Sequence, residues 1–391
     1  MIASIQEFGF EVPILARSSG EVVDGHLRLK AAQKLGLGEV PVILCDEFTE
    51  AQVKAFRLLV NRSASWADWD IELVALEIQE LRAADFDLSL TGFAPLEIDN
   101  FLFPAPKTIA EEQIPELARE AVTRLGDRWR CGEHMVLCGD ATSKDAVQLL
   151  LANVSPVLMV TDPPYGVSLD PTWRERAGLG KQRQVGVIAN DNQVDWRQAW
   201  KLFPGDVAYI WHAGIHAAEV AAGLESLGFR IRAQIIWVKQ HFALGRGDFH
   251  WQHEPCWYAV REGQPSRWCG DRSQSTVWEV PNLNPFGGSR DEPATGHSAQ
   301  KPVELIRRPI LNNSRRGEVV YDPFLGSGTT LIAAELTERV CYGVEIDPCY
   351  VDVIVRRWQQ LTGKQALLEE TGCSFDEVAA RSGGVACRER N

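Results

Sequence analysis

Residues 319–330 read Val-Val-Tyr-Asp-Pro-Phe-Leu-Gly-Ser-Gly-Thr-Thr, an apolar strand followed by a glycine turn and the start of a helix. Two glycines in such a turn allow a ligand to lie close to the backbone, as at nucleotide sites. The stretch lacks the Gly-Lys-Ser/Thr of a phosphate loop, and Leu331 occupies the third glycine position of the dinucleotide fingerprint. The next predicted strand ends in Glu345, an acid suited to a ribose diol. The pattern predicts a nucleoside ligand that needs no phosphate, or else a purely structural turn.

A second motif, residues 161–166, reads Thr-Asp-Pro-Pro-Tyr-Gly and directly follows a short apolar run. Buried parallel strands present active residues at their carboxyl ends. The two prolines fix the backbone and leave carbonyl acceptors, while Asp162 adds carboxylate acceptors and Tyr165 adds an aromatic face. Such a site can hold an amino group by its hydrogens and stack its ring on the tyrosine. A rigid loop is the alternative explanation.

Short apolar runs alternate with helical stretches from about residue 125 to 362. The predicted strands are 135–137, 157–161, 207–211, 231–238, 319–321 and 340–344, and the predicted helices are 145–152, 213–227, 302–312, 329–338 and 350–360. This alternation indicates an α/β domain with a mostly parallel sheet. Residues 363–391 are expected to be a tail with one short helix near 374–381.

The first 103 residues have a different pattern. Strands are predicted at 14–16, 21–24 and 40–44, and helices at 28–35, 50–59 and 69–83. These short elements indicate a small α+β domain. Residues 104–124 begin with a proline-rich, acidic run, which predicts a linker.

Charge is unevenly distributed along the chain, whose formal net charge is −13. Residues 1–103 have 8 basic and 17 acidic side chains, whereas residues 165–316 have 19 basic and 15 acidic ones. Fifteen of those 19 are arginines, and nine of the 13 tryptophans lie in the same segment. Arginine mixed with tryptophan suits contacts with phosphates and bases, although a cationic face on an ordinary core would give the same composition. The overall negative charge argues against coating of nucleic acid by charge alone.

Nine cysteines without a C-x-x-C pair predict reduced thiols rather than a disulfide framework or a metal site. No run reaches the roughly 18 apolar residues of a membrane span. The first residues are acidic and lack the basic start of a secretory signal. We therefore expect a cytoplasmic protein with no membrane contact and no metal.

Together the two motifs resemble those of the amino-directed DNA methyltransferases, which use S-adenosylmethionine. Residues 162–165 match the family's catalytic motif, residues 322–329 match its cofactor loop, and this order is that of the permuted β group. The resemblance covers about 125–362 and implies a seven-stranded, mostly parallel sheet with one reversed strand and helices on both faces. Further matches are Gly139-Asp140, Trp237-Val238-Lys239, His253-Glu254-Pro255, the set His297, Gln300, Lys301 and Pro302, and the acids Glu345 and Asp347.

The resemblance also implies an activity: direct in-line methyl transfer to N6 of an adenine flipped out of double-stranded DNA, as in restriction-modification systems. The implied catalytic residues are Asp162, Pro163, Pro164 and Tyr165. The implied cofactor-binding residues are Asp140, Lys301, Asp322, Pro323, Phe324, Gly326, Ser327, Gly328, Thr329, Glu345 and Asp347. The mechanism needs no metal.

Methylation of N4 of cytosine uses the same geometry and is the alternative. Aspartate at the first catalytic position, where serine is common in cytosine enzymes, favours adenine. A carbon-5 cytosine enzyme is set aside, because the two Pro-Cys pairs, 255–256 and 348–349, do not follow the catalytic strand. A nonenzymatic nucleotide-binding partition module would explain residues 1–103 but neither motif.

The N-terminal unit resembles the ParB/sulfiredoxin-like domain through Asp24-Gly25-His26-Leu27-Arg28 before a helix. The resemblance implies that Gly25, His26 and Arg28 are candidates for binding nucleotide phosphates at the helix start. The sulfiredoxin cysteine is absent near Gly25, so that chemistry is not expected. The other interpretation is a docking domain without a functional nucleotide-binding site.

Arginine-rich segments are the candidates for DNA contact. Residues 261–299 are the candidate target-recognition segment and contain Arg267 and Arg272. The loop 166–190 contains Arg174 and Arg176 and is expected to share this task or to close over DNA. Neither segment specifies the target sequence.

Overall fold

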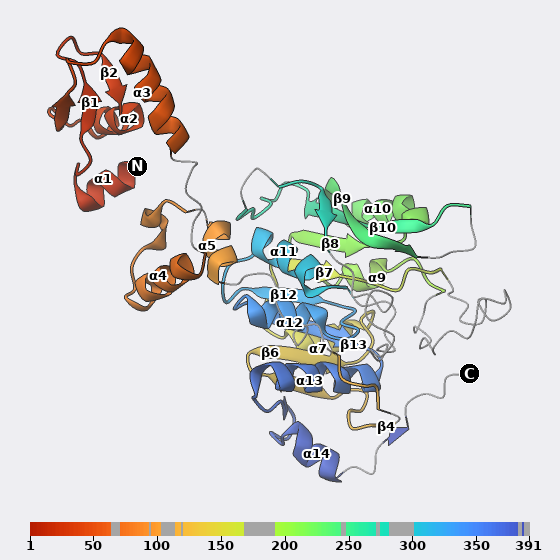
Figure 1. The fold of residues 1–391 in the computed structure, drawn as a ribbon. Coiled ribbons are helices and arrows are strands. Elements are labelled where there is room, and N and C mark those ends of the chain that lie inside the picture. Colours follow the sequence, from red (N-terminus) through yellow and green to blue (C-terminus); the bar gives the residue numbers. More distant parts are fainter. Residues whose placement is uncertain are drawn as a thin grey trace. The chain divides into compact units, whose positions relative to one another are not determined.

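The computed structural model describes residues 1–63, 71–93, 95–102, 114–118, 120–167, 192–243, 248–270, 274–280, 301–381 and 385–386. The chain divides into two compact units, residues 1–102 and 103–391 (Figure 1). The buried apolar clusters of the first unit are separate from those of the second. Each unit is therefore described by itself.

The first unit contains a three-stranded sheet in the order β2-β1-β3, with β1 antiparallel to β2 and parallel to β3. Val23, Cys45 and Val53 form its small core, and a second cluster of Val74, Ile78 and Ile98 holds the later helices together. The elements are α1 (Ile2–Phe8), β1 (Ile14–Ala16), β2 (Val22–Asp24), α2 (His26–Leu35), β3 (Val42–Leu44), α3 (Glu50–Ser63), α4 (Ile71–Ala83), η1 (Leu88–Thr91) and α5 (Pro95–Leu102).

The predicted strands and helices of this unit lie within a few residues of the observed ones. Helix α2 ends at Gly36, whose φ of 70° is the left-handed cap expected just past a helix. Helices α1 and α5 were not predicted. Helix α1 has only 7 residues and no side-chain cap, so the sequence carries neither a start signal nor enough turns to show a helical period.

The second unit is built on one large sheet. Its elements are β4 (Glu120–Ala121), β5 (Arg128–Cys131), β6 (His134–Cys138), α7 (Lys144–Leu151), β7 (Leu158–Thr161), α9 (Arg197–Trp200), β8 (Val207–Trp211), η2 (Gly214–His216), α10 (Ala217–Ser226), β9 (Phe229–Ala243), β10 (Trp251–Arg261), β11 (Val277–Glu279), α11 (Val303–Asn313), β12 (Val319–Asp322), α12 (Thr329–Leu336), β13 (Val340–Glu345), α13 (Pro348–Thr362), β14 (Leu367–Leu368), α14 (Phe375–Arg381) and β15 (Val385–Ala386). Helix α14 is the short helix expected near 374–381.

Ten strands of the described chain form this sheet, in the order β11-β9-β10-β8-β7-β12-β13-β6-β5-β14. Strands β8, β7, β12, β13 and β6 are parallel, and β10 runs antiparallel to both β8 and β9. The seven strands from β9 to β6 thus match the expected mostly parallel sheet with one reversed strand. The sheet is wider than predicted, because β11, β5 and β14 extend it. Strand β5 is a second reversed strand, because only two residues, at the tight turn of Gly132, connect it to β6.

Helices cover both faces of the sheet (Figure 1). Alternate residues of each strand face opposite sides, so Leu158 and Val160 of β7 join one apolar cluster while Met159 joins the other. Helices α11, α12 and α13 pack on the first side, and α7, α9 and α10 pack on the second. This is the predicted doubly covered α/β architecture.

Three observations bear on the remaining expectations. No helix in the described ranges is long and apolar enough to cross a membrane. The described part of the chain contains no group of three or more His, Cys, Asp or Glu side chains arranged to hold a metal.

Seven described cysteines are free thiols, but Cys349 is disulfide-bonded. The prediction of reduced thiols is therefore wrong at Cys349, because spacing along the chain does not reveal which sulfurs meet in the fold.

Candidate active site

The carboxyl ends of four parallel strands bring the predicted site residues to one edge of the sheet. Asp162 directly follows β7, Asp322 ends β12, Glu345 ends β13, and Asp140 follows β6. These four strands are neighbours in this order. The Thr161 hydroxyl donates a 2.7 Å hydrogen bond to Asp322 Oδ1, which ties the two motifs together across 161 positions of sequence. We call this side of the sheet the carboxyl edge.

Asp162 belongs to a largely buried cluster of four charged side chains, together with Glu254, Lys239 and Lys301. Lys301 Nζ lies 2.7 Å from Asp162 Oδ2 and 2.8 Å from Glu254 Oε2, and the Lys301 side chain is only 6% exposed. Lys239 pairs with the other carboxylate oxygen of Glu254. Two ammonium groups and two carboxylates therefore balance one another, which is the condition for keeping charges in a protein interior.

Burial and ion pairing act in opposite directions on the pKa values of this cluster. Burial raises the pKa of Asp162, and the Lys301 ammonium offsets only part of that effect. Burial also acts to raise the pKa of Glu254, but Lys301 and Lys239 outweigh it and bring the pKa to about 2. Burial acts to lower the pKa of Lys301, but the two carboxylates outweigh it and raise the pKa. Asp162 is thus the carboxylate of the cluster whose pKa lies above its ordinary value.

Tyr165 belongs to the same cluster. Its hydroxyl donates a 2.7 Å hydrogen bond to Asp162 Oδ1 and lies 3.0 Å from Lys301 Nζ, which donates to it. The Lys301 ammonium also lies 5.3 Å from the centre of the Tyr165 ring and 5.4 Å from that of Trp211, within reach of a cation–π attraction. The hydroxyl end of the half-buried Tyr165 ring is therefore fixed beside the Asp162 carboxylate.

The two prolines of the motif differ in what their carbonyls do. The Pro164 carbonyl accepts a 2.9 Å hydrogen bond from the Trp196 indole, whose ring packs edge-on against Phe324 at 4.7 Å. The Pro163 carbonyl has no hydrogen-bond partner among the described residues. An unused acceptor therefore lies next to the Asp162 carboxylate.

Asp322 organises the loop that follows β12 from inside the protein. It is only 3% exposed, and its two oxygens accept from the hydroxyls of Thr161 and Thr330 and from the backbone N–H of Phe324. Burial raises the pKa of Asp322 to about 6, although these hydrogen bonds oppose that effect. Asp322 therefore shapes the loop rather than presenting its carboxylate to a ligand. Pro323, Gly328 and Thr329 are also buried, whereas Phe324, Gly326 and Ser327 are partly exposed.

Gly326 and Glu345 meet at the surface of this loop. The Gly326 N–H donates a 2.8 Å hydrogen bond to Glu345 Oε2, and the Asp347 N–H donates one of the same length to Oε1. Gly326 has a φ of 51°, and a Cβ added there would meet nothing within 4 Å, so its backbone borders open space. Burial raises the pKa of Glu345 to about 7, against the effect of the two N–H donors.

The other predicted cofactor residues have structural partners. The Asp347 carboxylate caps helix α13 by accepting from the Cys349 N–H at 2.8 Å. Asp140 Oδ1 accepts from both the N–H and the hydroxyl of Thr142 at 2.8 Å. Lys301, predicted with the cofactor group, contacts Asp162, Glu254 and Tyr165 instead. It therefore lies in the charged cluster around Asp162.

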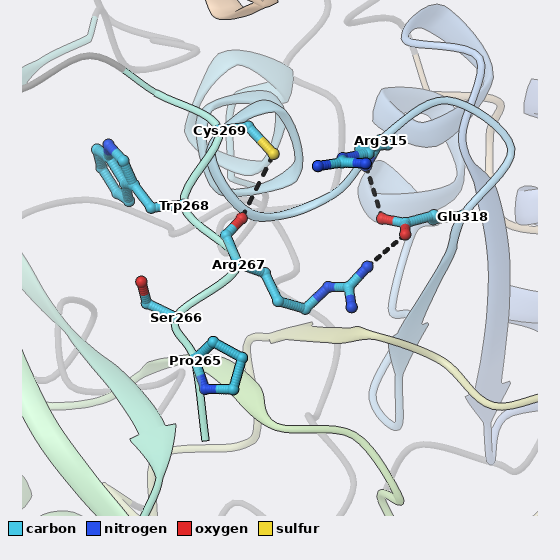
Figure 2. Close-up of a pocket in the computed structure, with 7 residues that line it drawn as sticks. All are labelled: Pro265, Ser266, Arg267, Trp268, Cys269, Arg315 and Glu318. Atoms are coloured by element: carbon cyan, nitrogen blue, oxygen red, sulfur yellow. Dashed lines mark hydrogen bonds and ion pairs between the residues drawn. The ribbon is translucent and has the colours of Figure 1, made fainter. Parts of the chain in front are cut away.

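Arg267, a candidate DNA contact, lies away from the carboxyl edge. Its guanidinium pairs with Glu318, which directly precedes β12, in a pocket of about 430 Å³ (Figure 2). Glu318 is four residues from Asp322, or about 13 Å along the strand, at the opposite edge of the sheet. Arg267 is therefore not brought to Asp162. Five further residues singled out in the sequence lie outside the described part of the chain: Arg174, Arg176, Arg272, His297 and Gln300.

The N-terminal candidates lie around the start of helix α2. Gly25 has a φ of 93°, and His26 is exposed. Arg28, however, pairs with Asp24 at 2.8 Å and donates to the Pro13 carbonyl at 3.3 Å. Its guanidinium is therefore used inside the unit, and phosphate binding by Arg28 stays an untested prediction.

The sequence motifs alone did not assign site roles to Glu254, Lys239 or Trp196. Glu254 and Lys239 lie on the paired strands β10 and β9, where neighbouring residues are mostly apolar. A charged side chain in the middle of such a strand is the signal that could have indicated a buried partner. Sequence alone does not show which partner it meets.

The chain was also compared with known proteins. A family model described as DNA methylase, for N6 and N4 enzymes, matches residues 157–356. A second model, the ParB-methyltransferase HTH domain, matches residues 72–125 and so includes the segment predicted as a linker. Since the first match covers about half of the sequence, the chain belongs to the DNA methylase family.

Individual relatives agree with this family. The type II methyltransferase M.Cfr9I of Citrobacter freundii is 34% identical over 157 residues, which cover 36% of this chain and 48% of that protein. The type II methyltransferase M2.MboI of Moraxella bovis is 25% identical over 225 residues, covering 52% of this chain and 81% of that protein. Thus the match spans about half the length of M.Cfr9I. The solved M1.HpyAVI–SAM complex is 21% identical with a TM-score of 0.42, covering 57% of this chain and 98% of that one.

Proposed function

We propose that this chain is a DNA methyltransferase that transfers the methyl group of S-adenosylmethionine to N6 of adenine. The observation that carries the proposal is the pair of acceptors after β7, the Asp162 carboxylate and the Pro163 carbonyl, which accepts no hydrogen bond from the described residues. An exocyclic amine is a weak nucleophile, because its lone pair is drawn into the ring. Two acceptors that each take one amino hydrogen favour a pyramidal nitrogen with its lone pair available. Positioning and electrostatics then supply most of the rate acceleration.

The charged cluster supports Asp162 in this role. Lys301 occupies Oδ2 and Tyr165 donates to Oδ1, so the orientation of the carboxylate is set before the base arrives. A carboxylate oxygen has two lone pairs, so Oδ1 can accept from the amine in addition to Tyr165. After transfer the nitrogen gives its extra proton to the Asp162 carboxylate, which passes it to water, and no covalent enzyme intermediate forms.

The substrate proposed is double-stranded DNA. An amino group inside a duplex cannot reach Asp162, which has a side chain only 27% exposed, so the base has to leave the stack. Tyr165, three residues from Asp162, offers the aromatic ring on which the extruded base would stack.

The residues after β12 and β13 fit a nucleoside without phosphate. Gly326 exposes its backbone to open space, and each Glu345 oxygen keeps a lone pair for a ribose hydroxyl after accepting one N–H. When bound, S-adenosylmethionine supplies the methyl group as part of an electrophilic sulfonium. Gly326, Glu345 and the partly exposed Phe324 and Ser327 are the residues that would hold it.

Adenine is preferred to cytosine because aspartate stands at position 162. N4 of cytosine carries the same two amino hydrogens and is the second candidate. The test is to incubate the purified chain with DNA and labelled S-adenosylmethionine, hydrolyse the DNA and identify the methylated nucleoside. N6-methyldeoxyadenosine is expected, whereas N4-methyldeoxycytidine would support the second candidate. A folded, cofactor-binding protein that methylates no DNA contradicts the proposal, and base-resolved mapping of a plasmid from expressing cells would give the target sequence.

We also propose that different parts of the chain have different functions. Residues 125–362 would carry binding and chemistry, and residues 1–103 would form a separate domain joined through residues 104–124. The separate apolar clusters of the two units support this division. The ParB-methyltransferase HTH model matches residues 72–125, which are the last part of the first unit and the start of the second, and this match supports a role in target engagement rather than in catalysis.

A further inference from the structure

The hairpin of β9 and β10 extends from the sheet on the same side as Asp162. Strand β9 is parallel to β8, because both are antiparallel to β10, so β9 ends at the carboxyl edge. The last pair before the turn is Ala243 with Trp251. The residues that follow the turn, including Phe249 and Trp251, therefore lie on the side from which a base must enter.

Large apolar side chains are exposed at this hairpin and beside it. Phe249 is 92% exposed, Trp251 is 49% exposed, and Ile215, which follows β8 at the same edge, is 67% exposed. We call these three residues the hairpin patch. Such a group is costly in water and marks a contact surface when it lies beside a functional site.

The Trp251 side chain of the patch is held in place by packing. The Trp251 ring packs on Gly214, where an added Cβ would lie 2.9 Å from two ring atoms, and its centre is 5.4 Å from that of His253. Gly214 directly precedes Ile215, so the tryptophan and the isoleucine belong to one surface. The position of Trp251 is therefore fixed from behind while half of its surface faces solvent.

The same strand connects the patch to the charged cluster around Asp162. Glu254, which contacts Lys301, is three residues from Trp251 and five from Phe249. At about 3.3 Å per residue these separations are about 10 and 17 Å. These are the longest distances that an extended backbone allows, and a duplex advances about 3.4 Å per base pair, so the patch lies within about five base pairs of a base held beside Glu254 and Asp162.

We propose that the hairpin patch contacts duplex DNA within about five base pairs of the methylated base. This inference rests on the proposed function. Among the described residues of the hairpin, the ammonium of Lys239 is already paired with Glu254, so the three patch residues offer apolar rather than cationic contacts. It suits sugars and base edges, into which exposed aromatic and aliphatic side chains insert, rather than phosphates. Its contribution to affinity should therefore change little with salt.

The test uses the full chain with Phe249→Ser and Trp251→Ala, alone and combined, and Leu149→Ala as the matched control. Leu149 is a 50% exposed apolar residue on helix α7. Because it loses both exposed aromatic side chains of the contact, the double variant should bind a duplex containing the target about 10- to 100-fold more weakly. Its affinity for S-adenosylmethionine and the slope of log affinity against log salt should stay those of the wild type, and the control should match the wild type throughout.

Position is tested by placing a photo-crosslinking residue at 249. Cross-links within about five base pairs of the methylated base are expected, and cross-links elsewhere overturn the inference. Unchanged DNA affinity and unchanged KM for DNA in the double variant, with an active wild type, also overturn it and leave the proposed function standing. A wild type that neither binds nor methylates DNA overturns both. Loss of self-association in the double variant with unchanged DNA affinity would assign the patch to a second copy of the chain and reject the DNA contact.

Discussion

The ammonium nitrogen of Lys301 lies 2.7 Å from Oδ2 of Asp162, although 139 positions separate the two residues. Lys301 directly precedes Pro302, the N-cap of α11, and Asp162 follows β7, so the ion pair joins the approach to a helix with the end of a central strand. Because Glu254 takes a second hydrogen of the same ammonium group, Lys301 holds two carboxylates at once. The electrostatic state of Asp162 therefore depends on residues outside its own motif.

Replacing Asp162 by alanine removes an acceptor that is used in the transition state. Methyl transfer to DNA should fall by about a hundredfold or more, while binding of S-adenosylmethionine largely survives. Single-turnover transfer from labelled cofactor gives the rate, and calorimetry gives the affinity. Activity near the wild-type level would show that Asp162 is not the acceptor of the amino hydrogens.

Lys301 and Glu254 should shift the acid limb of the pH–rate profile in opposite directions. The amine needs Asp162 as a carboxylate, so the rate rises with pH through the pKa of Asp162. Lys301 lowers this pKa and Glu254 raises it, so Lys301→Met moves the limb to higher pH and Glu254→Gln moves it to lower pH. The profile of kcat for each variant is the measurement.

Lys201, an exposed lysine, provides the control Lys201→Met, which should leave the profile unchanged. Breaking a buried ion pair costs about 3–5 kcal/mol, so thermal melting of Lys301→Met has to accompany its kinetics. Glu254→Gln keeps the shape of the side chain and keeps the test decisive if the lysine variant unfolds. Shifts in the same direction for both variants would contradict the proposed coupling.

Gly326→Asp should abolish cofactor binding, because the new side chain projects into the open space beside Glu345 and adds a like charge there. The matched control is Gly317→Asp. Gly317 also has a positive φ, 73°, and open space around its Cβ position, but it precedes β12 at the other edge of the sheet. Both variants should lose a similar amount of stability, and only Gly326→Asp should lose the heat of S-adenosylmethionine binding in calorimetry. Wild-type affinity in Gly326→Asp would reject this cofactor site.

Affinity for the cofactor should rise with pH between about 6 and 8. A ribose hydroxyl donates to the carboxylate form of Glu345, and the pKa of Glu345 is about 7 because the side chain is buried. Below that pH the group must release a proton on binding, so affinity should fall by about tenfold per pH unit. Glu345→Gln should bind more weakly and with a flat pH dependence, while Glu262→Gln, at an exposed position, should keep the wild-type slope.

A chain beginning at Ala110 should fold, bind S-adenosylmethionine and methylate DNA, because the apolar clusters of residues 122–375 contain no residue of the first unit. Weaker target engagement is expected, since the shortened chain loses most of the segment that matches the HTH domain. Melting, calorimetry and methyl transfer give the three readouts. A soluble, cofactor-bound short chain that methylates no DNA would show that the N-terminal unit completes the active enzyme.

The sequence determined the secondary-structure types and the groups with which each central strand ends. Apolar runs of three to five residues followed by polar turns predicted β7, β8, β12 and β13, because burial on both faces requires such runs. The same local patterns placed Asp162 and Glu345 at the ends of strands, and a parallel sheet necessarily brings such ends to one edge. Strand β5 was missed because it has only four residues, Arg-Trp-Arg-Cys at 128–131. Their alternation between polar and apolar is too short to show a clear strand period.

Only the tertiary structure decided which charged groups meet. Lys239, Glu254 and Lys301 come from two strands and the approach to a helix, and no local period relates them to Asp162. The tertiary structure also separated Arg267 from the carboxyl edge and fixed the Trp251 ring against Gly214. Periodicity reports whether a side chain faces the interior, because that depends on the geometry of one element. Which buried charges become partners depends on the order and packing of elements far apart in the chain, and on the need to neutralise each charge once water is excluded.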